Sequence, residues 1–200
     1  MISQTVRIGE VPPAMMGFVP PLMRRRLSPL QRMVFTLADA LTEGGKVRCP
    51  LFFASRDGED SLTRKLVESY NAAGDVSPGR FSTSVYNAAP GLYSILTENR
   101  ASYGALAAGE ETVECGLLEA VLAAGERVWI HAEETEGGYG CGARFADPAA
   151  GVQGRAVSCL AGDPSRPPLT FAAVADFLSG TCNRLEGRYL TLVEGDGTIE

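Results

Sequence analysis

The feature that most constrains the fold is a run of residues that reads as strand, sharp corner, buried helix and strand. Small apolar residues at 104–108 lead into a Gly-Glu-Glu corner at 109–111. A helix that is apolar on nearly every side follows at about 112–124, so we expect it to be buried. A strand is predicted at 127–132. Enzymes use such an elbow to hold a nucleophile at a helix N-terminus, but here the corner carries Glu110, whose carboxylate is a poor place to store an acyl group.

The rest of the chain alternates strand and helix patterns. Strands are predicted at residues 4–8, 49–55, 154–161 and 187–193, and helices at 22–41, 61–73, 81–97 and 169–178. Ser28-Pro29 breaks the first helical stretch and caps a new helix, and Ser61 and Thr170 are predicted caps of later helices. The alternation over residues 47–133 predicts a βαβ-type layered sheet, which is an α/β fold class.

Two segments interrupt this alternation. Residues 11–21 hold four prolines together with Met15, Met16 and Phe18, and they are predicted to form an extended apolar loop that packs on its own core or meets a partner. Residues 137–142 (GGYGCG) are predicted to form a flexible or tightly turned loop. This loop lacks the strand before it and the helix after it that a phosphate-binding loop needs.

Charge argues against a nucleic-acid partner. The chain has a net charge of −6, whereas a protein that binds nucleic acid needs clustered Lys and Arg. The one basic cluster, Arg24 to Arg26, lies in a predicted helix. We interpret it as a solvated helix face in preference to a phosphate or partner site.

The cysteines and the single histidine do not predict a metal site. The five cysteines include no CxxC pair, and His131 stands alone, so the spacing of zinc ligands is missing and no cofactor is expected. Residues 1–10 lack the apolar region of a signal peptide, and no run of about eighteen apolar residues could span a membrane. We therefore expect reduced thiols and a cytoplasmic location.

Four segments carry a resemblance to a known family. They are LSPLQRM at 27–33, FASRDGE at 53–59, SPGRFSTSVYNAAPGLYSI at 77–95 and ASYGALAAGEETVECGLLEA at 101–120. In order and spacing they resemble the N-terminal half of a β-ketoacyl synthase of the thiolase-like fold. The resemblance is strongest to the small chain-length-factor-like proteins of aryl polyene, type II polyketide and fatty-acid clusters. It implies a layered α-β-α half-fold with a ketosynthase-like core at 1–135 and a C-terminal extension, 136–200, that completes or decorates the same domain.

The resemblance also places the elbow. In an active ketosynthase this corner carries the cysteine that takes the acyl chain, and the alignment puts Glu110 at that position, while a slip of one residue would put Gly109 or Glu111 there. The two catalytic histidines belong to the family's C-terminal half, which this chain is expected to lack, and His131 matches neither of them. We interpret His131 as a partly buried strand residue and Cys115 as an ordinary packed thiol. The resemblance therefore implies a pseudoenzyme.

The function that the resemblance implies is that of a non-catalytic subunit. The chain would pair with a full-length ketosynthase as a heterodimer or heterotetramer, meet acyl carrier protein indirectly, and help to wall the acyl-chain tunnel. The candidate residues of the tunnel or the partner interface are Phe81, Tyr86, Leu92, Tyr93 and Glu110. Two alternatives remain open. One is a malonyl-carrier-protein decarboxylase or acyltransferase that uses Glu110 or a cysteine, and the other is a self-assembling scaffold without acyl chemistry.

Overall fold

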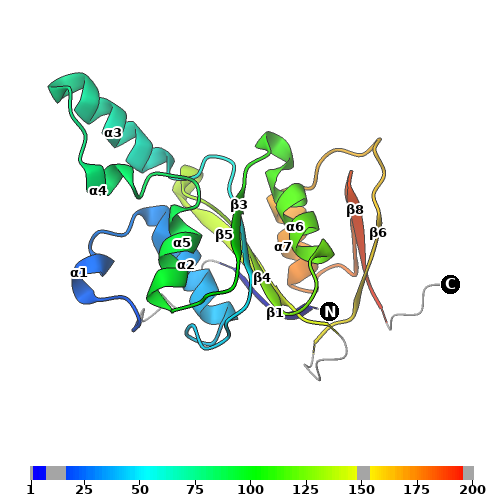
Figure 1. Cartoon of the computed structure of the whole chain (residues 1–200). Helices are drawn as coiled ribbons and strands as arrows, with labels where there is room; N and C mark the ends of the chain where they lie inside the picture. Colours follow the sequence, from blue (N-terminus) through cyan, green and yellow to red (C-terminus); the bar gives the residue numbers. More distant parts are fainter. Residues whose placement is uncertain (1, 8–16, 148–153, 196–200) are drawn as a thin grey trace.

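A five-stranded sheet forms the centre of the molecule (Figure 1). The computed structural model of the chain describes residues 2–7, 17–147 and 154–195. The strands lie in the order β1 (Ile2–Arg7), β5 (Tyr139–Phe145), β4 (Arg127–Glu133), β2 (Leu51–Ala54) and β3 (Tyr103–Leu106). Strands β4, β2 and β3 run parallel, while β5 runs antiparallel to both β4 and β1. The layered α/β fold that the sequence predicts is confirmed.

The glycine-rich segment is the main error of the sequence-based prediction. Residues 137–142, expected to form a loop, lead instead into β5, which lies between β4 and β1 inside the sheet. Its glycines permit close packing: a Cβ at Gly140 would lie 3.1 Å from Leu37 Cδ1, and one at Gly142 would lie 2.8 Å from Leu41 Cδ1. The glycines of this segment therefore let a helix lie directly against the strand, a role that composition alone does not distinguish from a turn.

One face of the sheet is covered by α2 (Pro29–Leu41) and α5 (Ala88–Leu96). The short helix α1 (Pro21–Arg24) precedes α2 on the same side of the molecule (Figure 1). The Ser28 cap is confirmed, since its hydroxyl accepts the Gln31 N–H at 3.0 Å and the Gln31 side chain accepts the Ser28 N–H at 3.2 Å. This reciprocal capping box starts α2 directly after the break that Pro29 enforces. Phe35 and Tyr93 anchor the core on this face.

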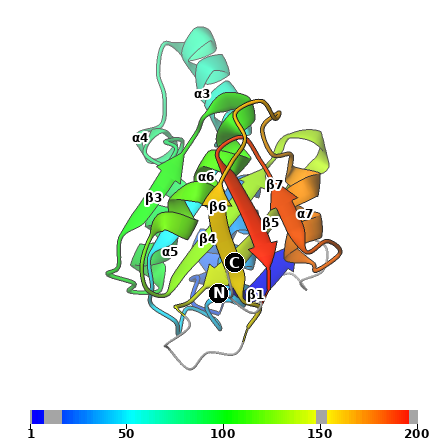
Figure 2. The same cartoon turned by 90° about the vertical axis from the view of Figure 1, so that its right-hand side faces the viewer.

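The other face is covered by two helices and a second sheet. Helices α6 (Thr112–Leu122) and α7 (Phe171–Leu178) lie between the five-stranded sheet and a three-stranded sheet, which Figure 2 shows in front. That sheet has the order β6 (Val157–Ala161), β8 (Leu190–Glu194) and β7 (Arg184–Glu186). The predicted Thr170 cap is confirmed by the bond from the Ala173 N–H to its hydroxyl, whereas β7 was not predicted.

Helix α6 is buried on only one side, which corrects the expectation of a helix that is buried all round. Val113, Leu117 and Ala120 face the core, while Leu122 is 73% exposed. A buried acid on the same helix, Glu114, accepts hydrogen bonds from three backbone N–H groups of the C-terminal segment, those of Leu169, Tyr189 and Leu190. The part of the chain beyond residue 135 is thus joined to the elbow helix.

An arm projects from this body (Figure 1). It consists of α3 (Asp60–Ala73) and α4 (Pro78–Phe81), and Leu66 is the only buried residue of α3. Ser61 is not the cap that the sequence suggests. Its N–H and its hydroxyl both donate to the carboxylate of Glu134, so the cap comes from the residue after β4.

The helix predicted at 81–97 is divided. Residues 82–84 follow α4 as turns, because the hydroxyls of Ser82, Thr83 and Ser84 bond back to carbonyls of the preceding turn, and α5 begins only at Ala88. Among the described residues, no helix is both long and apolar enough to cross a bilayer. Residues 11–16 of the predicted proline-rich loop lie outside the described part of the chain.

Candidate functional site at the elbow

The elbow has the order of elements that the sequence predicts. Strand β3 leads through a short 3-10 turn, Gly109–Glu111, into α6. Gly109 has φ of +58°, a conformation that favours glycine. The Thr112 hydroxyl fixes the corner, because it accepts the Ala108 N–H at 2.9 Å and donates to the Gly109 carbonyl at 2.7 Å. Glu110 is exposed at the tip of this corner.

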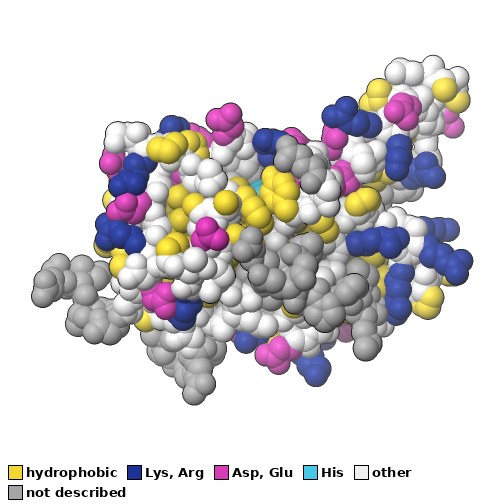
Figure 3. All heavy atoms as spheres, turned by 180° about the vertical axis from the view of Figure 1, so that it is seen from behind, with side chains coloured by type: hydrophobic (Ala, Val, Ile, Leu, Met, Phe, Trp, Pro, Cys, Tyr) yellow, Lys and Arg dark blue, Asp and Glu magenta, His cyan; other side chains and the backbone are white. Residues whose placement is uncertain are grey.

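A pocket of about 380 Å³ opens at the corner. We call it the elbow pocket. Its lining combines the corner, the ends of β4 and β5, and the chain before α7: Arg56, Gly109, Glu110, Thr112, Val113, His131, Glu133, Tyr139, Pro167, Pro168, Leu169, Thr170 and Phe171. Figure 3 shows a small part of the single histidine between hydrophobic side chains on this side of the molecule. The pocket is therefore built from segments that are far apart in the sequence.

His131 is a neutral, buried member of this pocket. Its side chain is 2% exposed, and neither ring nitrogen has a hydrogen-bond partner among the described residues. Glu133 Oε1 is 3.9 Å from Nε2, which is too far for a hydrogen bond. Burial lowers the pKa of His131 to about 4. Its ring lies among those of Trp129, Tyr139 and Phe171, at centroid distances of 5.9 to 6.4 Å, so it is fully buried where the sequence predicted partial burial.

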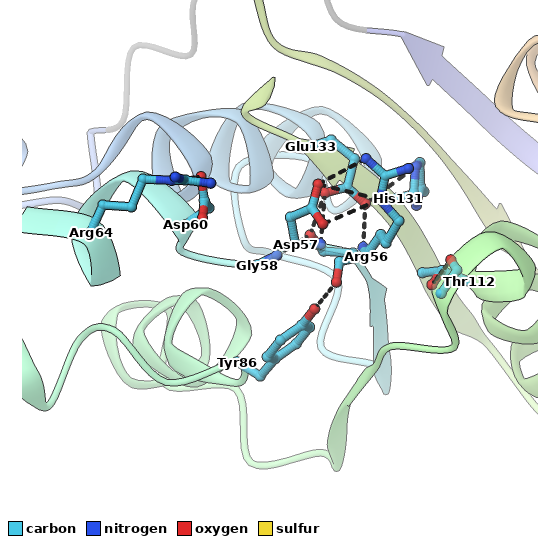
Figure 4. A network of polar contacts seen from close by, with 11 residues as sticks. Arg56, Asp57, Gly58, Asp60, Arg64, Tyr86, Thr112, His131 and Glu133 are labelled. Carbon is cyan, nitrogen blue, oxygen red and sulfur yellow. Dashed lines mark hydrogen bonds and ion pairs between the residues drawn. The ribbon is translucent and has the colours of Figure 1, made fainter. Parts of the chain in front are cut away.

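Glu133 holds the loop that follows β2. Its carboxylate accepts the Ser55 hydroxyl at 2.9 Å, the Asp57 N–H at 3.2 Å and the Arg56 N–H (Figure 4). Burial raises its pKa, and these hydrogen bonds act in the opposite direction. The Tyr86 hydroxyl donates to the Arg56 carbonyl from the other side of the loop. The lone pairs of Glu133 are thus used within the fold.

Few reactive groups are available at the corner. The Arg56 guanidinium pairs with Asp57 at 2.9 Å. Cys115 lies on α6 and does not line the elbow pocket, and burial raises the pKa of its thiol, which disfavours the reactive thiolate. Among the described residues, no cluster of histidine, cysteine and acidic side chains could hold a metal ion. The pocket therefore offers a neutral imidazole, an exposed carboxylate, an arginine that is already paired with Asp57, and apolar walls.

The structure does not bring the five candidate residues together. Glu110 lines the elbow pocket, and Phe81 and Tyr86 are exposed on and after α4. Leu92 is half-buried and lines a different cleft. Tyr93 lies in the core, where its hydroxyl is 2.6 Å from Thr42 Oγ1. Sequence reasoning missed Tyr139 and Phe171 of the elbow pocket, because their segments carried no signal that they fold over the corner.

The fold is similar to those of solved ketosynthase structures. One chain of the structure described as "Ketosynthase (ApeO) in Complex with its Chain Length Factor (ApeC) from Xenorhabdus doucetiae" matches with a TM-score of 0.70 and 16% identity, over 96% of this chain and 97% of that chain. "The ishigamide ketosynthase/chain length factor" matches with a TM-score of 0.52 and 16% identity, over 78% of this chain and 61% of that chain.

A third solved structure extends the comparison to another ketosynthase. The β-ketoacyl synthase from Burkholderia phymatum STM815 matches with a TM-score of 0.54 and 12% identity, over 83% of this chain and 55% of that chain. No curated protein matches the chain. The sequence family described as beta-ketoacyl synthase, N-terminal domain, matches residues 3–128, which is more than half of the chain. The chain therefore belongs to the family of β-ketoacyl synthase N-terminal domains.

Proposed function

We propose that the chain is a non-catalytic, chain-length-factor-like subunit that pairs with a full-length ketosynthase. The acyl products of this pair would be those of aryl polyene or fatty-acid-like polyketide biosynthesis. The observation that carries the proposal is the open edge of the sheet at β3, directly before the elbow. Strand β3 pairs with β2 alone among the described strands. An open edge presents unpaired backbone groups to another chain.

Apolar side chains are exposed on β3 and on the two helices that contact it. Tyr103 on β3 is 43% exposed. The two helices that contact β3, α5 and α6, expose Ile95 to 72% and Leu122 to 73%. The Ser102 carbonyl accepts the N–H of Leu51 on β2, and the Leu106 carbonyl accepts the N–H of Ser55 directly after β2. The backbone groups of the alternate residues therefore face outward. Exposed apolar side chains beside an unpaired strand favour an interface with another chain.

A ketosynthase is the favoured occupant because two of the similar structures are described as ketosynthase and chain-length-factor complexes. The first of them matches over nearly the full length of both chains, which supports a small subunit of this size. We further propose that residues 136–200 complete the same domain as 1–135. The insertion of β5 into the central sheet and the three hydrogen bonds of Glu114 support this.

The elbow pocket supports a passive role for Glu110. A malonyl group is anionic. The pocket already holds Glu110 and the buried Glu133, its histidine is neutral, and the arginine in its lining, Arg56, is already paired with Asp57. Like charges in a partly buried site repel each other, so this environment disfavours the decarboxylase alternative. We propose that Phe81, Tyr86 and Leu92 contact the partner or its acyl tunnel, and that Tyr93 acts only through core packing.

Co-expression with a full-length ketosynthase from the same genome tests the pairing. We expect a stable heteromeric complex on size-exclusion chromatography with light scattering. The Tyr103→Lys, Ile95→Glu double variant should lose the complex and keep its thermal unfolding midpoint. Tyr189→Lys is the matched control, because Tyr189 is exposed to a similar extent, 40%, on another face. A wild-type chain that stays alone, or a double variant that still pairs, would contradict the proposal.

Incubation with malonyl- and acyl-carrier protein tests the lack of catalysis. We expect no release of carbon dioxide and no acyl mass on the chain, and Glu110→Gln should leave both results unchanged. Carbon dioxide released by wild type but not by Glu110→Gln would establish the decarboxylase instead. A covalent acyl mass on Cys115 or Glu110 would likewise overturn the assignment.

A further inference from the structure

A second cleft is larger than the elbow pocket and is lined by a different set of residues. It has a volume of about 750 Å³ and lies between α1 and the start of α2 on one side and the α3–α4 arm on the other. We call it the basic cleft. Four of its lining residues are cations, Arg25, Arg26, Lys65 and Arg80, and none of its described lining residues is acidic. Figure 3 shows dark blue side chains gathered on the side of the molecule that carries α1 and α3.

The charges of these four cations are not neutralised within the described part of the chain. None of the four has an ion pair or a side-chain hydrogen bond there, although most of the other arginines are paired or bonded to backbone carbonyls. Two come from the α1 end and two from the arm. In a chain with a net charge of −6, four unpaired cations that converge on one hollow create a local positive field.

The inner wall of the cleft is partly apolar and firmly built. Leu27, Leu62 and Leu92 contribute apolar surface. Gln31, which is 2% exposed, lies behind them and donates to the buried Glu59 at 2.9 Å and to the Thr83 carbonyl at 3.3 Å. Burial raises the pKa of Glu59 to about 7, so this acid neutralises the cations only weakly. A ligand that fits therefore combines an anionic group with an apolar part.

We infer that the basic cleft binds a small molecule that carries phosphate on an apolar organic group. Three of the four cations are arginines, whose planar guanidinium matches phosphate oxygens in a bidentate manner. The volume suits a small ligand and not only a single ion. Arg25 and Arg26 follow α1 instead of lying within it, and both are exposed as the sequence reading of a solvated surface expects. The inference adds a ligand for these two residues. Leu92 is also a proposed contact to the partner, but the ligand test changes Arg80 and Lys65 and uses the chain without a partner. Either proposal can therefore fail alone.

Calorimetric titration of the purified full chain with hexyl phosphate, inorganic phosphate and hexanol tests the inference. We expect saturable binding of hexyl phosphate, at least about tenfold weaker binding of inorganic phosphate because the apolar wall is not used, and no binding of hexanol. Raising NaCl from about 0.05 M to about 0.5 M should weaken hexyl phosphate binding severalfold. Absence of saturable binding, or equal binding of hexanol, would overturn the inference.

Variants separate this site from general attraction to a charged surface. Arg80→Gln and Lys65→Gln should each weaken hexyl phosphate binding by about three- to tenfold. Arg100→Gln is the matched control, because Arg100 is exposed and does not line the cleft. Equal loss in the control would show diffuse attraction and contradict a built site. Binding of an acidic peptide in the absence of any phosphate binding would also contradict it and indicate a protein ligand.

Discussion

The elbow pocket and the basic cleft differ in whether their charged groups have partners within the protein. In the elbow pocket Glu133 accepts three hydrogen bonds from the loop after β2, and Arg56 pairs with Asp57. In the basic cleft four cations have no partner among the described residues. Charges that are satisfied inside a fold stabilise it, whereas charges left unpaired in a hollow remain available to a ligand. The comparison predicts that substitutions around the elbow lower the free energy of unfolding strongly, and that substitutions of the cleft cations lower it little.

The largest expected effect is at Glu114. Glu114→Ala would leave the backbone N–H groups of Leu169, Tyr189 and Leu190 without their acceptor in a buried site. We expect the free energy of unfolding to fall by about 3–5 kcal/mol in urea titrations. The exposed Glu119 on the same helix is the matched control, and Glu119→Ala should change it by less than about 0.5 kcal/mol. Equal effects would show that residues beyond 135 do not depend on the elbow helix.

The second prediction concerns how the free energy of unfolding changes with pH. The buried group of the elbow pocket and the one behind the basic cleft contribute changes of opposite sign. Burial lowers the pKa of His131 to about 4, so between pH 4 and 6.5 the unfolded chain binds more protons there and stability rises with pH. Burial raises the pKa of Glu59, behind the basic cleft, to about 7, so between pH 4.5 and 7 the folded chain keeps a proton that the unfolded chain loses, and stability falls with pH. Each contribution amounts to about 3 kcal/mol, and together they nearly cancel.

Variants that remove one of the two groups show the pH dependence that the other contributes. In Glu59→Gln the histidine contribution remains, and the free energy of unfolding should rise by about 2–3 kcal/mol from pH 4.5 to 6.5. In His131→Leu it should fall over the same interval. Urea titrations at several pH values measure both slopes. Parallel pH profiles for wild type and both variants would mean that neither group is as strongly perturbed as its burial implies.

The third prediction tests how closely the elbow helix lies on the sheet. A Cβ at Gly116 would lie 2.5 Å from Ala54 Cβ and 3.1 Å from Trp129 Nε1, so Gly116→Ala should lower the free energy of unfolding by about 1–3 kcal/mol. At Gly104 the nearest atom to an added Cβ is Glu119 Oε1 at 3.6 Å, which is ordinary contact. Gly104→Ala should therefore be tolerated. Equal free energies of unfolding for the two variants in urea titrations would contradict the close packing of α6 on β2.

Much of the fold could be predicted because it depends on local patterns. Ser28 and Thr170 cap their helices as expected, since a cap is read from a residue and its near neighbours. The predictions failed where distant segments decide. The strand character of β5 depends on α2 packing against its glycines, and Ser61 is bonded by Glu134, 73 residues away. Sequence placed Glu110 at the corner, but the walls of the elbow pocket, such as Phe171, depend on tertiary contacts.

The smallest expected effect is at the basic cleft, and it is the most direct test of the comparison. Arg25→Gln and Arg80→Gln remove cations that have no described partner, so each should change the free energy of unfolding by less than about 0.5 kcal/mol. Relief of repulsion between the remaining like charges can even raise it slightly at low salt. Urea titrations in the absence and presence of hexyl phosphate measure both properties, since the ligand should stabilise wild type more than either variant. A fall of more than about 1 kcal/mol in the free energy of unfolding without ligand would mean that these cations hold the arm in place. The charged groups of the basic cleft would then be structural, like those of the elbow pocket.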